Sequence, residues 1–123
     1  MESEKAKDLT DRLFNFTVDV IKFLRTIENN GETRILKYQL TKSSSSSGAN
    51  YEEAQGAISK ADFNSKVSIA LKEMRESNYW LRVIYAFELG DKNVCNKYVK
   101  ESFELKNILG SIFSKVSKSL KKN

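Results

Sequence analysis

Apolar residues recur at alternating steps of four and three along most of this chain, and this spacing constrains the fold more than any other feature. In the first segment they stand at Leu9, Leu13, Phe16, Val20, Phe23 and Ile27. Such steps keep one face of an α-helix apolar, so the pattern predicts a helix that packs along its length at a shallow crossing angle. A second stripe makes that face wider than one bundle core requires, and we expect part of it to face another subunit: Phe14, Val18, Ile21 and Leu24.

The same spacing runs through a stretch that resembles a disordered linker. Five consecutive serines occupy residues 43–47 and precede Gly48. The stripe nevertheless keeps its steps through Leu36, Leu40, Ser43, Ser47, Asn50, Ala54 and Ala57. Serine and glycine are poor helix formers, so packing has to compensate, and small side chains let a facing helix approach closely. The pattern therefore favours a long helix with a narrow serine face, and a flexible Gly/Ser linker is the alternative.

Two further segments repeat the pattern and complete the fold prediction. Their stripes are Phe63, Val67, Ala70, Met74, Ser77, Leu81 and Ile84, then Tyr98, Leu105, Leu109, Ile112, Val116 and Leu120. A capping box at residues 59–62 and a glycine at position 90 mark helix ends. We expect helices at about residues 6–29, 33–57, 60–89 and 92–120, in one domain that spans 1–123. Short connections make neighbouring helices antiparallel, so the predicted fold is an all-α, left-handed, up-down-up-down four-helix bundle.

The residue types that most metal and catalytic sites need are scarce. The chain has no histidine and a single cysteine, Cys95, which excludes a Cys/His metal site, an internal disulfide and the di-iron site of some bundles. We expect Cys95 to be a small apolar side chain. Glu73 and Glu76 form an E-x-x-E pair, but the adjacent basic residues favour a solvated charged face over a metal site.

No catalytic group accompanies the paired carboxylates of Glu52 and Glu53, because no nucleophile or phosphate-binding loop is recognisable. We therefore expect no enzyme and no cofactor. No segment approaches the roughly 18 apolar residues of a membrane span, and the opening residues, MESEKAKD, differ from a secretory signal. We expect a cytoplasmic protein without a membrane partner.

Positive charge is the main pointer to a ligand. The formal net charge is +5, and residues 114–123 form a short basic tail with four lysines and no acid. Our candidates for phosphate contacts are Arg12, Lys22, Arg25, Arg34, Lys37, Lys42, Lys115 and Lys118. Phosphate binding depends on the summed electrostatic field of the protein, and an oligomer repeats the cations of one subunit in every copy. The alternative is a mixed charged surface with a frayed end. Nothing in the sequence indicates a protein that recognises a specific base sequence.

Polar and aromatic side chains at unusual positions suggest two further sites. Gln39, Asn50 and Glu53 lie on or near the core stripe, where a polar group is costly unless it is hydrogen-bonded. We interpret them as an inter-helix or inter-subunit polar network that fixes register, in preference to a ligand site. Tyr79 and Trp80 could stack on nucleic-acid bases, but their apolar neighbours favour burial in the bundle or in an interface.

Three stretches resemble a known family. They comprise Tyr38, Gln39 and Leu40; Ser46, Ala49, Asn50 and Glu53; and Phe63, Ile69, Ala70, Leu71, Glu73, Glu76, Tyr79, Trp80 and Leu81. The series resembles the bacterial four-helix bundle proteins encoded in intervening sequences of 23S ribosomal RNA genes, which are similar to the accessory variability proteins of diversity-generating retroelements. The resemblance covers roughly residues 9–120, and the lysine tail is outside the family pattern.

The resemblance implies a homopentamer with no known catalytic activity and a role in binding nucleic acid or a nucleic-acid enzyme. Our leading hypothesis is a non-enzymatic, homo-oligomeric helical scaffold whose basic surface holds RNA or DNA without strong sequence preference. One alternative is an adaptor that docks a nucleic-acid enzyme such as a reverse transcriptase. Another is a structural protein that persists with a mobile insertion.

Overall fold

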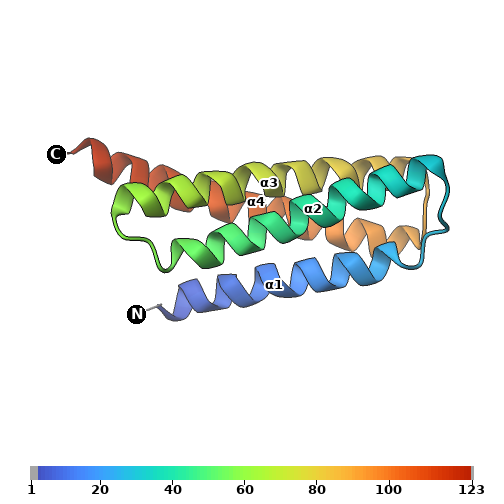
Figure 1. Cartoon of the computed structure of the whole chain (residues 1–123), viewed down its shortest axis with the longest axis horizontal. Coiled ribbons are helices and arrows are strands. Elements are labelled where there is room, and N and C mark those ends of the chain that lie inside the picture. Colours follow the sequence, from blue (N-terminus) through green and yellow to red (C-terminus); the bar gives the residue numbers. More distant parts are fainter. Residues whose placement is uncertain (1–2, 123) are drawn as a thin grey trace.

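The computed structural model describes residues 3–122, which form an antiparallel four-helix bundle (Figure 1). Its helices are α1 (Glu4–Leu24), α2 (Gly31–Ala54), α3 (Lys60–Ala86) and α4 (Lys92–Lys121). α1 begins and α4 ends at the same end of the bundle, and the α1–α2 and α3–α4 connections lie at the other end. The predicted all-α four-helix bundle is confirmed, and the residues described contain no strand.

Three helices end earlier than the apolar stripes predicted. α1 stops at Leu24 rather than residue 29, although Ile27 is still buried, because the connection folds back against the core. α2 begins at Gly31 rather than residue 33, because Asn30 and Thr33 form a reciprocal capping box. An apolar stripe shows which side chains are buried, and a buried residue of the following loop, such as Ile27, can extend the stripe beyond the end of the helix.

The α2–α3 and α3–α4 connections differ in how they turn the chain. Ser59 caps α3 as predicted, and its hydroxyl accepts from the Asp62 N–H at 3.0 Å. α3 ends at Ala86 rather than residue 89, because Glu88 and Gly90 adopt positive φ angles of 56° and 70°. A side chain at Gly90 would place its Cβ 2.9 Å from the Phe23 ring, so this turn requires glycine.

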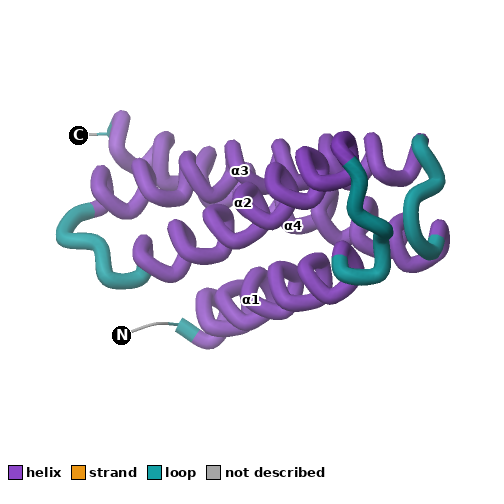
Figure 2. The backbone as a smooth tube through the Cα atoms, turned by 45° about the vertical axis from the view of Figure 1, so that its right-hand side comes forward, coloured by secondary structure: helices purple, strands orange, loops and turns teal. Residues whose placement is uncertain are grey.

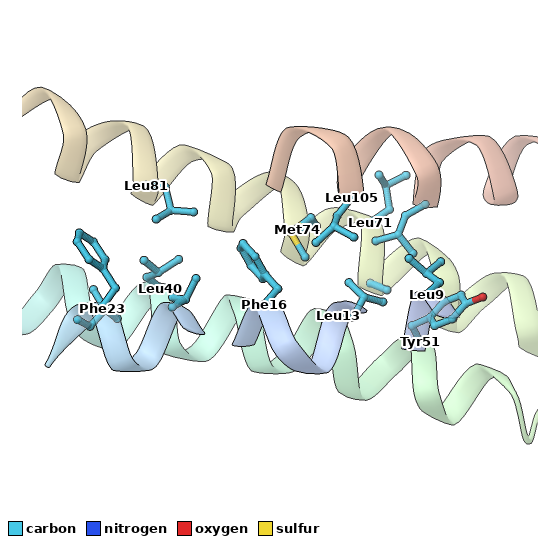
Figure 3. Close-up of a cluster of buried hydrophobic side chains, with 14 of the residues drawn as sticks. Leu9, Leu13, Phe16, Phe23, Leu40, Tyr51, Leu71, Met74, Leu81 and Leu105 are labelled. Atoms are coloured by element: carbon cyan, nitrogen blue, oxygen red, sulfur yellow. The ribbon is translucent and has the colours of Figure 1, made fainter. Parts of the chain in front are cut away.

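α3 is the central element of the packing. α2 and α4 pack along most of its length, while α1 leans against α2 and makes fewer contacts with α4 (Figure 2). Figure 3 shows Leu13 and Phe16 of α1 pointing into the same layer as Met74 and Leu105 from α3 and α4. Each of these four side chains is at most 2% exposed.

The serine run lies inside α2, so the linker alternative is wrong. Ser43, Ser44 and Ser47 are buried. The Ser47 hydroxyl donates to the Ala70 carbonyl at 2.7 Å, and the hydroxyls of Ser43 and Ser77 lie 2.8 Å apart, so both serines bond across to α3. Small side chains on α2 thus permit the close helix contact that the sequence predicted.

One position of the predicted α2 stripe differs from the structure. Asn50, the predicted core position, is half-buried, whereas Tyr51 is buried at 3% exposure. The next predicted position, Ala54, is buried at 1% exposure, so the stripe keeps its register to the end of the helix.

Candidate nucleic-acid interface

The predicted phosphate-binding residues do not form one patch on the chain. Lys22, Arg25, Arg34 and Lys42 are exposed on α1, the α1–α2 connection and α2. Lys115 and Lys118 are exposed near the end of α4. At 1.5 Å of rise per residue, roughly 35 Å of helix separates Lys115 from the start of α4, which lies beside the α1–α2 connection.

Arg12 is occupied by carboxylates. Its Nε and Nη2 atoms donate to the two Glu101 oxygens at 2.7 and 2.8 Å, and Nη2 lies 3.0 Å from Glu104. These bonds hold the pKa of Arg12 above its usual value. The hollow around it, about 400 Å³, is acidic on balance and is lined by Asp8, Asp11, Arg12, Asn15, Phe16, Asp19, Lys97, Tyr98 and Glu101. Arg12 therefore joins α1 to α4, and it is a poor phosphate ligand.

Lys37 is also engaged within the chain. Its ammonium donates to the Ile27 carbonyl, and to the Asn29 side-chain oxygen at 2.7 Å. Both acceptors belong to the α1–α2 connection. Lys37 thus closes the loop that precedes its own helix.

The basic tail is helical, because α4 continues to Lys121. Two contacts with α3 hold its last turns in place. Lys60 donates to the Ser119 hydroxyl at 2.7 Å, and Asn64 donates to the Ser117 hydroxyl at 2.9 Å. The frayed end of the alternative interpretation is therefore absent, and the described part of the tail is helix through Lys121.

The structure does not join Gln39, Asn50 and Glu53 into an inter-helix network. Asn50 donates to the carbonyl and hydroxyl of Ser46 in its own helix, Glu53 is exposed and Gln39 is half-buried. The inter-subunit version of that network stays a prediction. Between α3 and α4, the cross-helix role belongs to Asn78, whose amide donates to the Val99 carbonyl at 3.1 Å and to Ser102 at 3.0 Å.

A different basic surface lies on the outer side of α3 and α4. We call it the α3–α4 basic face and define it by five cations and two aromatic rings: Lys72, Arg75, Tyr79 and Arg82 from α3, and Lys100, Phe103 and Lys106 from α4. The residues of each set follow one another at helical steps of three or four, so each set forms one row. All but Lys106 are exposed.

Asn78 marks the seam that brings the two rows together. It is 8% exposed and bonds to Val99 and Ser102 of α4. Arg82 lies one turn beyond it and donates through Nε to the Asn78 oxygen at 2.9 Å. Phe103 follows Ser102 directly along α4. The rows therefore border one seam, with Arg82 at its edge.

The acidic residues of these helices lie outside the two rows, and Glu76 borders the α3 row one turn from Lys72. Glu101 and Glu104 pair with Arg12 of α1 on the opposite side of α4. Glu73 interacts electrostatically with Lys42 of α2, and Trp80 donates to Glu76 at 3.2 Å. Neither row of the α3–α4 basic face contains an acid. Glu101 and Glu104 of α4 thus lie toward α1, whereas Lys100 and Lys106 lie toward the outer side of α3; Lys97 is on the α1 side.

Sequence reasoning missed this face, although its residues are visible in the sequence. Tyr79 is 50% exposed, so it is not buried in the bundle, and its burial in an interface stays a prediction, whereas Trp80 is half-buried. Phe103 is 52% exposed. The available signal was the spacing of Lys72, Arg75, Tyr79 and Arg82, a polar and aromatic row beside an apolar stripe.

The remaining candidates for chemistry are structural. Cys95 is fully buried, and this burial raises the pKa of its thiol to about 11. Burial, and secondarily the charge of Glu76, raise the pKa of Glu73. The described residues contain no group of three or more His, Cys, Asp or Glu side chains placed to hold a metal ion.

A third surface, the α1–α2 face, has one charged residue, Glu52, in the lining of its hollow. It surrounds a hollow of about 250 Å³ between the two helices, lined by Thr10, Phe14, Thr17, Ser45, Gly48, Ala49 and Glu52. Phe14 is 63% exposed, and so is Tyr38 farther along α2. From the predicted second stripe of α1, Leu24 is buried, while Val18 and Ile21 are half-buried. This face displays apolar side chains that the chain itself does not cover.

Fold and surface together define a small four-helix bundle whose acidic, basic and sparsely charged faces are separate. The family model described as 23S rRNA-intervening sequence protein matches residues 5–111, and the chain belongs to that family. The predicted resemblance is confirmed. The match ends before Lys115 and Lys118, in agreement with the expectation that the lysine tail is outside the family pattern.

A solved structure supports the same assignment. It is the 1.70 Å crystal structure of a protein with unknown function from the S23 ribosomal protein family of Bacteroides thetaiotaomicron. That protein is 31% identical, with a TM-score of 0.77, and the similarity covers 85% of this chain and 97% of the other. No curated protein matches the chain. Neither the family description nor the neighbour's description names a catalytic activity.

None of the four described helices combines the length and hydropathy that a bilayer crossing requires.

Proposed function

We propose that this protein is a non-enzymatic, homo-oligomeric helical scaffold that binds RNA or DNA through the α3–α4 basic face. The observation that carries the proposal is the segregation of charge on α4. Five cations on this face have no acid within their rows, while Glu101 and Glu104 are held on the other side by Arg12. A surface of one sign attracts the phosphate backbone and gives little preference for sequence.

Competing surfaces fit a polyanion less well. The hollow around Arg12 would repel phosphate, because Asp8, Asp11 and Asp19 also line it. The hollow beside Lys22 is lined by Asp19 and Asp91 as well. The α3–α4 basic face instead continues along α4 toward Lys118 and Lys121, at the same helical steps.

Fluorescence anisotropy of a labelled oligonucleotide, titrated against salt, tests the proposal. If about five phosphates are neutralised, log affinity should fall against log salt with a slope of roughly −3 to −4. The variant Arg75→Glu/Lys100→Glu should lose at least about tenfold in affinity at low salt, because both side chains are exposed and belong to opposite rows of the face.

The matched control is Lys22→Glu/Lys42→Glu, which changes net charge equally at two exposed positions outside the face. It should retain most of the affinity, apart from the loss of long-range attraction. Greater sensitivity to the control pair would move the site to α1 and α2 and refute the assignment. Absence of binding at low salt, or affinity that ignores salt, would refute phosphate binding altogether.

The scaffold part of the proposal uses the α1–α2 face. Phe14 and Tyr38 expose aromatic rings on a surface with little charge, and aromatic residues are enriched in protein interfaces while lysine and glutamate are depleted. A second copy of this chain is the occupant that we propose, and a homopentamer is the assembly that the family resemblance implied. An adaptor for a nucleic-acid enzyme would use the same face for a different protein.

A further inference from the structure

We propose that the α3–α4 basic face binds single-stranded nucleic acid in preference to duplex, with unpaired bases stacking on Tyr79 and Phe103. This inference rests on the proposed function and specifies its ligand class. Cations alone would hold either form, because both expose phosphates. The two rings are the feature that distinguishes them.

Each ring is exposed and lies beside a cation of its own helix. The Arg82 guanidinium carbon lies 5.7 Å from the centre of the Tyr79 ring, and the Lys106 ammonium lies 4.4 Å from the centre of the Phe103 ring. The rings nevertheless remain 50% and 52% exposed. A base that stacks on such a ring brings its own phosphate close to the neighbouring cation, which is the combination found in sequence-tolerant single-strand binding.

The rings come from both sides of one seam. Tyr79 adjoins Asn78 in α3, and Phe103 adjoins Ser102 in α4, and Asn78 and Ser102 are hydrogen-bonded to each other at 3.0 Å. Two stacking positions therefore flank a fixed contact between helices. A flexible single strand can present successive bases to both, whereas the bases of a duplex are already stacked on one another.

The surroundings of the rings disfavour a protein partner at this site. The cores of protein interfaces are depleted of lysine, yet Lys72, Lys100 and Lys106 accompany Tyr79 and Phe103. The α1–α2 face has the opposite character, with exposed rings and few charges. Single-stranded nucleic acid would use both features of the α3–α4 basic face, because its bases stack on the exposed rings while its phosphates contact the cations.

A comparison of two probes tests the inference. The probes are a labelled oligo-uridine and a duplex RNA of equal length without single-stranded ends, each titrated with the intact protein at several salt concentrations. The variant Tyr79→Ser/Phe103→Ser should bind oligo-uridine at least about tenfold more weakly. Its duplex affinity and both salt slopes should stay unchanged, because no cation has been removed.

Two controls separate stacking from other effects. Tyr79→Phe/Phe103→Tyr should retain oligo-uridine affinity, since both positions keep an aromatic ring. Phe87→Ser removes another exposed ring, 63% exposed, outside the face and should have no effect. Circular dichroism and urea unfolding of each variant establish that the bundle is intact.

The single tryptophan provides an independent readout. Trp80 lies against Tyr79 with ring centres 5.0 Å apart. Oligo-uridine should therefore change Trp80 emission, and the duplex should change it much less.

If the serine variant loses affinity equally for both probes, or for neither, the inference is overturned. The proposed function would still stand in that case, provided that the unaltered protein binds in a salt-dependent way. Failure of the unaltered protein to bind either probe would remove both.

Discussion

Arg12 and Arg75 carry the same charge in opposite surroundings. The Arg12 guanidinium is held by both oxygens of Glu101 and by Glu104. Arg75 is exposed in a row without acids. A cation that is already paired with carboxylates must lose them before it can hold a phosphate, so the two residues differ in role although the sequence gives them equal weight.

We expect Arg12→Ala to affect stability and leave binding unchanged. The Arg12 and Glu101 side chains are 34% and 30% exposed, so solvent weakens the pair, but its two parallel bonds favour a measurable contribution. Urea unfolding should give a loss of about 1 kcal/mol in the free energy of unfolding. The control Arg25→Ala, at an exposed loop position, should change it by less than about 0.5 kcal/mol. A loss of oligonucleotide affinity in Arg12→Ala would instead restore Arg12 as a phosphate ligand.

The chain alone could not reveal this difference. Arg12 and Glu101 are 89 positions apart, and only the packing of α1 beside α4 brings them together. The same limit applies to Lys37, whose partners lie in the preceding loop. Counting charges in a sequence window selected exposed and paired cations alike, so the sequence predicted a basic protein but could not separate Arg12 and Lys37 from the exposed cations.

At the level of the helices, the serine run of α2 shows how weak helix formers are retained by packing. Ser47 is fully buried and donates to the carbonyl of Ala70 on α3, whereas Ser45 is exposed and donates to Thr41 in its own helix. Identical residues two positions apart thus serve different purposes. Ser47 sets the distance between two helices, whereas Ser45 only donates a hydrogen bond to a carbonyl of its own helix.

Leucine at each of these two positions measures that difference. Ser47→Leu should destabilise the bundle by about 2 to 3 kcal/mol or more, because the larger side chain cannot fit against α3 and the hydroxyl bond is lost. Ser45→Leu should change stability by less than about 0.5 kcal/mol, because leucine is a good helix former at an exposed site. Urea unfolding with circular dichroism gives both values. Equal effects of the two substitutions would contradict the close α2–α3 contact.

Helix stripes were the most predictable level of this protein. Of the predicted α3 stripe, Phe63 is half-buried, and the other six residues are buried: Val67, Ala70, Met74, Ser77, Leu81 and Ile84. The helix ends were less predictable, because Ile27 is buried from a loop and Glu88 adopts a positive φ angle. Side-chain spacing reports burial, while the end of a helix depends on local backbone contacts that spacing does not record.

Over the whole molecule, the three surfaces differ in charge, so each surface suits a different kind of partner. The acidic side between α1 and α4 is bridged by Arg12, the α3–α4 basic face is cationic, and the α1–α2 face has one charged residue in the lining of its hollow. An assembly through the α1–α2 face would leave the basic face of every copy exposed. The summed field of several copies would then attract one polyanion more strongly than a single chain could.

This arrangement predicts that assembly and nucleic-acid binding respond to different substitutions. Phe14→Glu/Ala49→Glu places two charges on the α1–α2 face and should shift the protein from an oligomer, expected at five times the mass of one chain, to a monomer. Both positions are exposed, so the bundle itself should stay folded. Arg75→Glu/Lys100→Glu should weaken binding at least about tenfold at low salt while the oligomer remains intact.

Analytical ultracentrifugation, with anisotropy on the same samples, distinguishes the possible outcomes. If copies act together, the monomeric Phe14→Glu/Ala49→Glu variant should bind a long single strand more weakly than the oligomer, by more than its two added charges explain. The control Glu28→Lys/Lys97→Glu exchanges two exposed charges outside the α1–α2 face and keeps net charge constant, so it should remain oligomeric. A monomeric unaltered protein, or an oligomer that survives the α1–α2 substitutions, would contradict the proposed contact.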